Sequence, residues 1–378
     1  MPDVDVAILG AGPAGSAAAI GLARLGYQVA LLDKKIFPRE KLCGDFINPV
    51  NWAIFCDLGV EDRVLAEPHG EVTAFRITNS SGREAEASFP SHDRRRSTGV
   101  GLRRAALDQL LAQRAAELGA TIRLGYRIEE LSRTARGWQL KSGEESWQAK
   151  FLIGADGRNS WVAKQLGLNR RGAAQGRSVG FQSRLRCPGA IGGRIEIHLF
   201  PGGYAGVVGL GDGTITLAMA IDRRRLSGGR GAEFLFDNLL GQNPHLKAIL
   251  ERRQGAVELR SVYPVYFPAR RCVADGALLV GDAARVSEPV TGEGIYFAMR
   301  SGLLAAESID VALRRGNLAA TGLAGYERAC RRAFRSRLAL NALLRFAVYH
   351  PALVDPLIRL SANHGRLLDS LVDAVCVP

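Results

Sequence analysis

The feature that most constrains this chain is a glycine-rich turn near its start, between an apolar run and an alanine-rich stretch. Residues 4–9 form the apolar run, the turn carries Gly10, Gly12 and Gly15, and residues 16–25 have helical composition. In such a turn the first glycine permits the tight bend, the second admits a phosphate, and the third lets helix and strand approach closely. The pattern predicts a buried strand and a helix whose N-terminus binds an anion.

A second predicted strand, over residues 27–32, ends at Asp33. This acid follows the glycines by about 20 residues, the place where a carboxylate binds the ribose hydroxyls of a dinucleotide. The strand, turn, helix, strand and acid together predict a Rossmann-type nucleotide-binding unit.

Two further glycine-rich signatures occur later in the chain. Gly154-Ala155-Asp156-Gly157 follows a short apolar strand, and Gly281-Asp282-Ala283-Ala284 leads into Pro-Val-Thr-Gly-Glu-Gly at residues 289–294. Asp282 stands at the end of a predicted strand, where a sheet presents side chains to a ligand. Gly292 and Gly294 open a predicted helix whose positive end would face negative charge. A chain that returns three times to one ligand predicts FAD. For Asp156, cofactor contact and a purely structural turn remain two open interpretations.

The order of the other elements predicts an α/β fold in which a Rossmann-type FAD-binding domain is interleaved with a β-sheet substrate domain, followed by C-terminal helices. Alternating strands are expected at 194–200, 204–210 and 214–221, and one helical segment at 231–253. We assign 1–70, 100–170 and 270–320 to the FAD-binding domain, 71–99 and 171–269 to the substrate domain, and 321–378 to the helices.

Composition narrows the classes of partner. The net charge is +13, but the arginines form short doublets and triplets along the chain without an accompanying recognition motif, so no nucleic-acid partner is expected. Six cysteines form no CxxC pair and no metal-ligand spacing, which favours reduced thiols in a cytoplasmic protein without a metal. No apolar run is long enough for a membrane span. The apolar faces of 323–378 favour core packing, with a cap over a lipophilic substrate or peripheral contact with the inner membrane face as alternatives.

The three signatures resemble the flavoprotein superfamily that contains p-hydroxybenzoate hydroxylase, over residues 4 to about 310. Lys41-Leu42-Cys43-Gly44 and the segment 289–295 look most like its geranylgeranyl reductase branch, which also holds monooxygenases of polyketides and other lipophilic aromatics. The resemblance implies these contacts with FAD: Ala14, Gly15 and Arg104 at the pyrophosphate, Asp33 at the adenosine ribose, the Ile128 backbone at adenine, Cys43, Gly44 and Phe46 along the ribityl–flavin side, Asp282 at the ribityl chain, and Gly294 and Ile295 at the isoalloxazine.

One departure from that branch bears on the reaction. Its prenyl reductases usually carry Tyr-x-Trp-x-Phe-Pro, whereas residues 204–209 read Tyr-Ala-Gly-Val-Val-Gly and keep only Tyr204. This difference favours an FAD-dependent monooxygenase that hydroxylates a hydrophobic aromatic or polyketide-type molecule. The alternative is an FAD-dependent reductase of isoprenoid double bonds. A halogenase is less favoured, because the Trp-x-Trp-x-Ile-Pro motif is missing.

Cys43 and Tyr204 are the candidate catalytic residues. In the reductase, Cys43 would return a proton to the substrate, and a structural buried thiol is the alternative interpretation. Residues 209–213, Gly-Leu-Gly-Asp-Gly, lie between two predicted strands and therefore indicate a hairpin turn rather than a second nucleotide site. The electron donor is expected to be NAD(P)H, visiting transiently, or a reduced partner protein.

Overall fold

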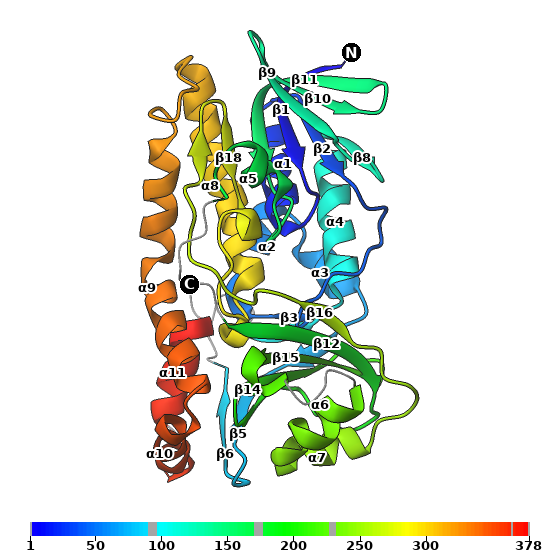
Figure 1. Cartoon of the computed structure of the whole chain (residues 1–378), viewed down its shortest axis with the longest axis vertical. Helices are drawn as coiled ribbons and strands as arrows, with labels where there is room; N and C mark the ends of the chain where they lie inside the picture. The colour runs from blue at the N-terminus through cyan, green and yellow to red at the C-terminus, as the bar shows by residue number, and fades with distance from the viewer. Residues whose placement is uncertain (1, 90–96, 170–176, 227–231, 364–365, 377–378) are drawn as a thin grey trace.

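The computed structural model describes residues 2–89, 97–169, 177–226, 232–363 and 366–376. Two sheets lie one beyond the other along the long axis of the molecule, and a long C-terminal helix runs beside both of them (Figure 1). This arrangement confirms the predicted class, a Rossmann-type unit joined to a β-sheet and followed by C-terminal helices.

The first sheet contains the glycine-rich turn. Its parallel strands lie in the order β18 (Ala277–Leu279), β11 (Glu145–Gly154), β1 (Asp3–Leu9), β2 (Val29–Asp33) and β8 (Thr121–Leu124). The antiparallel strand β17 (Val273–Ala274) lies at the edge next to β18, and β9 (Glu130–Thr134) and β10 (Gly137–Ser142) form a hairpin beside β11. Because β1 and β2 lie in the interior of this sheet, their apolar residues are buried on both faces.

Helices α1 (Pro13–Arg24) and α4 (Arg104–Glu117) pack against this sheet, and α8 (Gly294–Arg314) packs against α1. Helix α1 begins at Pro13, earlier than the predicted residue 16, because a proline at the first helical position loses no intrahelical hydrogen bond. Helices α1 and α8 approach so closely that a Cβ on Gly302 would lie 2.3 Å from the Ala14 carbonyl oxygen. The shorter helices are α2 (Trp52–Leu58), α3 (Glu61–Ala66) and α5 (Trp161–Gln165).

The second sheet has seven strands. Their order is β16 (Arg260–Val262), β12 (Ser178–Arg186), β15 (Thr214–Asp222), β14 (Gly203–Gly209), β13 (Arg194–Phe200), β5 (Ala74–Thr78) and β6 (Glu84–Ser88), and only β13 and β5 pair in parallel. The predicted hairpin at 209–213 joins β14 to β15. A small sheet of β3 (Phe46–Ile47), β7 (Gly99–Gly101) and β4 (Gly70–Val72) lies between the two large ones.

The prediction of one helical segment over 231–253 is wrong. The described part holds two helices, α6 (Ala232–Asn238) and α7 (Pro244–Glu251), separated by a 3₁₀ turn. The Asn243 side chain accepts a hydrogen bond from the Leu246 N–H and so caps α7, while Pro244 occupies its first turn. A proline disfavours helical geometry in the residue before it, which forces the break at Asn243.

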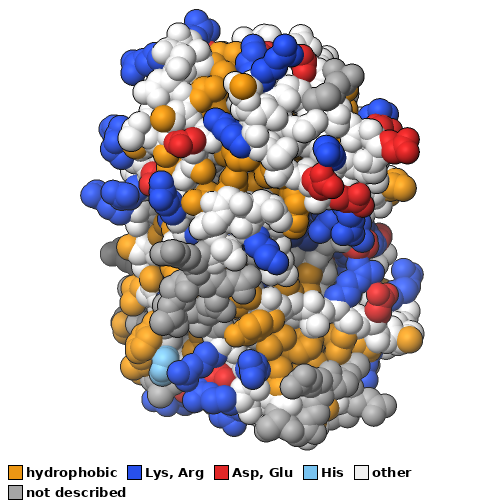
Figure 2. All heavy atoms as spheres, turned by 45° about the horizontal axis from the view of Figure 1, so that its top comes forward, with side chains coloured by type: hydrophobic (Ala, Val, Ile, Leu, Met, Phe, Trp, Pro, Cys, Tyr) orange, Lys and Arg blue, Asp and Glu red, His pale blue; other side chains and the backbone are white. Residues whose placement is uncertain are grey.

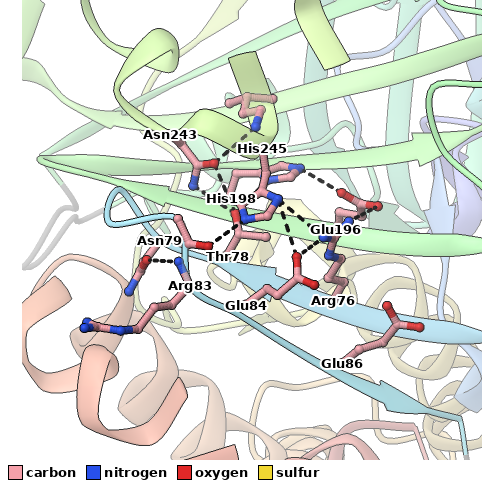
Figure 3. A network of polar contacts seen from close by, with 12 residues as sticks. Arg76, Thr78, Asn79, Arg83, Glu84, Glu86, Glu196, His198, Asn243 and His245 are labelled. Atoms are coloured by element: carbon pink, nitrogen blue, oxygen red, sulfur yellow. Dashed lines mark hydrogen bonds and ion pairs between the residues drawn. The ribbon is translucent and has the colours of Figure 1, made fainter. Parts of the chain in front are cut away.

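The two faces of the second sheet differ. Helices α6 and α7 cover the face that carries Ala205 and Val207, where a buried polar network also lies (Figure 3). In this network His198 contacts Thr78 at 2.8 Å and Glu196 at 3.2 Å, and burial lowers the pKa of His198. Residues alternate between sheet faces, so Tyr204 and Gly206 point to the opposite face. Asn243, the cap of α7, donates to Thr78 of this network at 2.9 Å, so the network attaches α7 to the sheet. The opposite face packs against the C-terminal helices.

The C-terminal segment forms α9 (Ala324–Val348), α10 (Pro351–Asn363) and α11 (Arg366–Cys376). Helix α9 runs along both sheets, and α10 and α11 pack against β6 of the second sheet (Figure 1). Within the described residues, no helix combines the length and apolar character that crossing a bilayer requires. On the face drawn in Figure 2, Lys and Arg side chains are dispersed, with acidic residues between some of them.

Candidate functional site

A cavity of about 290 Å³ lies between the two sheets and the C-terminal helices. Its lining has two parts, one from the Rossmann-type unit with glycines and charged groups, and one from the second sheet and the C-terminal helices that is apolar. The first part includes Gly12, Ala14, Lys41, Cys43, Gly44, Phe46, Arg104, Arg158, Asp282, Gly292, Gly294 and Ile295, and the second includes Phe75, Ile77, Phe89, Phe181, Ile195, Ile197, Tyr204, Gly206, Met219, Val265, Leu344, Val348, Leu368, Val372 and Cys376.

The N-terminus of α1 opens onto the first part of the cavity. Gly10 has a φ of +111°, and a Cβ on Gly15 would lie 1.9 Å from the Gly10 carbonyl oxygen, so both positions require glycine. The residue at its N-cap, Gly12, has no side chain and makes no capping hydrogen bond. Its free N–H groups face a cavity that Arg104 also lines, and together they form an anion site suited to a pyrophosphate.

Asp33 lies just behind that site, at the end of β2. Its two carboxylate oxygens accept hydrogen bonds from the N–H groups of Ala11 and Lys35, each at 2.9 Å. Arg39 reaches the same carboxylate at 3.4 Å and the buried Asp108 at 3.3 Å. Among the described residues the Nε of Arg39 has no hydrogen-bond acceptor, although it is buried. A buried donor without an acceptor is costly, so this region is suited to a ligand with oxygen acceptors.

The loop after β2 is attached to the second sheet through Asp45. Its backbone φ is +53°, in the left-handed region, and its carboxylate is fully buried. One oxygen accepts from the Arg104 N–H at 3.1 Å and so caps α4. The other accepts from Arg184 at 2.9 Å and from Thr216 at 2.8 Å, which belong to β12 and β15. The sequence prediction did not include Asp45, although it lies between two predicted site residues, Gly44 and Phe46.

Cys43 lines the cavity in the same loop. Burial raises the pKa of its thiol, and the nearby Arg104 guanidinium lowers it only in part. The thiol is therefore protonated at neutral pH, and a cationic neighbour is available to stabilise the thiolate. Such a group can give up a proton.

Asp282 lines the cavity from the turn after β18. Burial alone would raise its pKa, but Lys41 at 3.4 Å and Arg158 at 3.9 Å outweigh that effect and hold the pKa below its ordinary value. The side chain is thus a carboxylate at neutral pH, able to accept hydrogen bonds from ligand hydroxyls.

The start of α8 forms the cavity wall beside Phe46. A Cβ on Gly294 would meet no atom within 4 Å, so the helix N-terminus faces open space. Between the two glycines, Glu293 points away into the protein and binds Arg337 of α9 at 2.6 Å. Arg337 also donates to the Val375 carbonyl at 3.1 Å, so one buried guanidinium joins the start of α8 to α9 and α11.

The structure brings most of the predicted site residues together, and a few lie elsewhere. Cys43, Tyr204 and nine of the predicted cofactor residues line the cavity. Gly10 and Gly15 form the turn behind it, and Asp33, bonded to the Ala11 N–H of that turn, is not part of the lining. Ile128 follows β8 and packs in the core behind β2, outside the cavity lining. The nine are Gly12, Ala14, Gly44, Phe46, Arg104, Asp282, Gly292, Gly294 and Ile295.

Asp156 has a local role. Its carboxylate accepts from the Ser160 hydroxyl at 2.5 Å and from the N–H groups of Trp161 and Val162 at 2.6 and 3.1 Å. These contacts cap α5, and Asp156 is not part of the cavity lining, whereas its neighbours Ala155, Gly157 and Arg158 are. Of the two interpretations left open by the sequence, the geometry favours the structural one.

The residues around the cavity fit FAD. An uncapped helix N-terminus with Arg104 suits a pyrophosphate, Asp33 suits an adenosine ribose, and Asp282 suits a ribityl chain. The space before Gly294 suits a ring system near a helix N-terminus, and the large apolar remainder of the cavity leaves room for a hydrophobic substrate. Among the described residues, no group of His, Cys, Asp and Glu side chains has the arrangement of a metal site.

Comparisons with known proteins agree with this fit. Residues 3–187 match a family model described as an FAD binding domain. The chain is 30% identical over 358 residues to a digeranylgeranylglycerophospholipid reductase of Methanothrix thermoacetophila, covering 90% of this chain and 86% of that protein. It is 31% identical over 327 residues to a menaquinone reductase of Mycobacterium tuberculosis, covering 81% of this chain and 76% of that protein.

Solved structures show the same fold. A probable FAD-dependent monooxygenase from Pseudomonas aeruginosa superimposes with a TM-score of 0.76 and 20% identity, over 94% of this chain and 99% of the other. At that identity the likeness concerns the fold and not the reaction.

Proposed function

The chain belongs to the FAD-dependent oxidoreductases of the p-hydroxybenzoate hydroxylase superfamily, in the geranylgeranyl reductase-like branch, and from this we propose that it reduces a carbon–carbon double bond of a hydrophobic isoprenoid molecule. The sequence alone favoured hydroxylation. Two relatives of at least 30% identity bear the names of reductases, and the monooxygenase resemblance is one of fold, so reduction becomes the first proposal.

The observation that supports this proposal best is the protonated Cys43 thiol in the wall of a cavity whose opposite part is apolar. When bound, FAD supplies the hydride. Cys43 would hold the proton that the second carbon of the double bond needs, at its Sγ atom. Arg104 would stabilise the thiolate left behind, and water would return the proton after the product leaves. The apolar side chains of the second sheet and the C-terminal helices would orient the isoprenoid chain and exclude water.

The test is an anaerobic incubation of holoenzyme with geranylgeraniol, with NADPH or dithionite as the electron source. We expect the mass of the substrate to rise by two hydrogens per reduced double bond without oxygen. A product that gains one oxygen atom, and only in air, would instead support the second proposal, FAD-dependent hydroxylation of an aromatic or polyketide-type molecule. Activity with dithionite but not with NADPH would favour a reduced partner protein as the donor.

Filling the cavity at Gly206 should block the substrate and spare the cofactor. Gly206 lines the apolar part, and the nearest atom to a Cβ placed there is Cδ1 of Ile197 at 3.4 Å. We expect Gly206→Trp to lower kcat/KM at least tenfold, because the indole would occupy the substrate space, while Gly206→Ala stays within about twofold. Steady-state kinetics and FAD content measure the two effects. Unchanged kinetics in the tryptophan variant would place the substrate elsewhere.

We also propose a peripheral contact with an anionic lipid surface through the outer face of α9. Leu343 and Phe346 are 63% and 56% exposed, and Arg332 and Arg335 are exposed at helical spacing on the same helix. A helix face that carries both exposed apolar side chains and, about three turns away, exposed arginines is typical of surfaces that bind anionic membranes. We expect co-sedimentation with phosphatidylglycerol vesicles and a loss of binding in Leu343→Ser/Phe346→Ser. Equal sedimentation of the variant and the unmodified protein would contradict the contact.

A further inference from the structure

Tyr204, in the apolar part of the cavity wall, forms a polar pair with Glu288 behind it, and this pair has no part in the proposed proton transfer. Tyr204 lines the cavity from β14, and its hydroxyl donates to Oε1 of Glu288 at 2.7 Å. Both side chains are almost completely buried, at 3% and 2% exposure. The hydrogen bond between them offsets the cost of burying both groups, and it places one polar group, the Tyr204 hydroxyl, at an otherwise apolar wall.

Glu288 is held firmly behind Tyr204. The Asn341 side chain donates to the Glu288 carbonyl at 2.9 Å and accepts from its N–H at 3.3 Å. The hydroxyl of Tyr349 lies 3.5 Å from the same Oε1 that Tyr204 contacts. The Tyr204 and Tyr349 rings pack edge to face with centroids 6.1 Å apart. The position of the carboxyl group is therefore set by the protein, whether or not a ligand is present.

The protonation state of Glu288 determines whether the Tyr204 hydroxyl can donate a hydrogen bond to a ligand. Tyr204 has one hydroxyl hydrogen. When Glu288 is ionised, that hydrogen is given to the carboxylate. When Glu288 is protonated, the carboxyl group can donate to the tyrosine oxygen, and the tyrosine hydrogen is free to point into the cavity.

We propose that Tyr204, backed by protonated Glu288, forms a hydrogen-bond donor subsite for a carbonyl oxygen of a hydrophobic ligand, of the kind that a quinone or aromatic ketone carries. The inference rests on the proposed function and refines it, since it names the polar group that accompanies the reducible chain. A hydrocarbon of the same shape has no acceptor for this donor. Tyr204 would touch the ligand, and Glu288 would act as a positioning residue.

The surroundings of Glu288 make it the group that titrates. It faces Tyr204 on β14 and Tyr349 and Arg345 at the end of α9, and Tyr349 is influenced in turn by Ser178 and Asp222. Burial raises the pKa of both tyrosines, so they keep their hydrogens, and arginine stays charged. Burial also raises the pKa of Glu288, with Tyr204 and Arg345 opposing that effect only in part. The donor state is thus present at low pH and is lost as pH rises through this raised pKa.

The test compares 2,3-dimethyl-1,4-naphthoquinone with 2,3-dimethylnaphthalene, which lacks the carbonyls, by equilibrium dialysis against oxidised holoenzyme. For the unmodified protein we expect quinone affinity to fall about tenfold with rising pH, the value of one hydrogen bond, and hydrocarbon affinity to stay constant. In Tyr204→Phe the affinity for the quinone should fall by about the same factor, and only at low pH. Glu288→Gln, which supplies an N–H donor at every pH, should keep high quinone affinity throughout, and Tyr349→Phe should behave like the unmodified protein.

Three results would overturn the proposal. Tyr204→Phe could bind the quinone at low pH as tightly as the unmodified protein does, or Glu288→Gln could keep the pH dependence of the unmodified protein. The third result is that only Tyr349→Phe loses the preference for the quinone over the hydrocarbon. FAD content reports whether each variant folds. If Tyr204→Phe does not fold, the pH profiles of the unmodified protein and Glu288→Gln still decide. Because binding is measured without turnover, failure here is distinct from failure of the anaerobic reduction.

Discussion

Gly15→Val is expected to produce a chain that retains no FAD. The new Cβ would lie 1.9 Å from the Gly10 carbonyl oxygen, so the turn between β1 and α1 would have to open. Opening it moves the N–H groups at the start of α1 away from the pyrophosphate. Each hydrogen bond to a charged group contributes about 1.5–3 kcal/mol, so loss of two lowers FAD affinity at least roughly a hundredfold.

The measurement is the visible absorption spectrum of the purified protein, followed by titration with FAD. Gly192→Val provides the control, because a Cβ there meets no atom within 4 Å and the position lies in a loop of the second sheet. Circular dichroism separates loss of the cofactor from loss of the fold. A yellow Gly15→Val protein with unchanged FAD affinity would refute the assignment of this turn to the pyrophosphate.

Removal of the Arg337 side chain should destabilise the protein by about 3–5 kcal/mol, the typical cost of leaving one partner of a buried ion pair behind. Arg337 and Glu293 are 8% and 1% exposed and lie 2.6 Å apart. In Arg337→Ala the Glu293 carboxylate would lose the cation that the described residues place beside it at the start of α8. Arg332→Ala, on the exposed side of the same helix, should change the free energy of unfolding by about 0.5 kcal/mol or less.

The pH dependence gives a second readout of the same variant. Burial raises the pKa of Glu293 even with Arg337 opposing it, and loss of the arginine raises it further. A carboxyl group with a raised folded pKa favours the folded state when protonated, and this advantage disappears as pH rises through that pKa. Arg337→Ala should therefore lose more stability at pH 8 than at pH 5 in urea denaturation. The double variant with Glu293→Gln should recover part of the loss and show a weaker pH dependence, and equal losses at both pH values would contradict this account.

The sequence predicted those structural features that depend only on residues close together in the chain. The turn at Gly10 to Gly15, the strand ending at Asp33 and the helix after Gly294 are local patterns whose geometry follows from a few backbone positions. These patterns led to the cofactor and to the part of the cavity wall around Gly12, Ala14 and Gly294. Asn243-Pro244 also carried a local signal, a cap followed by proline, which the prediction of one continuous helix overlooked.

The sequence could not reveal groups whose role depends on distant partners. Asp45 binds Arg184 and Thr216, which follow it by 139 and 171 residues, and Glu288 binds Tyr204, 84 residues before it. A single acidic residue in a loop has no pattern that distinguishes these contacts from exposure to solvent. The reaction type is equally hidden, because it depends on a cavity shaped by several separate segments. The domain boundaries stay a prediction.

The shared carboxylate of Asp45 makes the cofactor side and the substrate side mechanically dependent on each other. A shift of β12 or β15 caused by a ligand would pull on the same side chain that caps α4 and sets the course of the chain between Cys43 and Phe46. Binding of a ligand against the second sheet would therefore change the surroundings of the flavin through Asp45, without a hinge movement. In such a molecule the visible absorption spectrum of the flavin would change when the substrate binds.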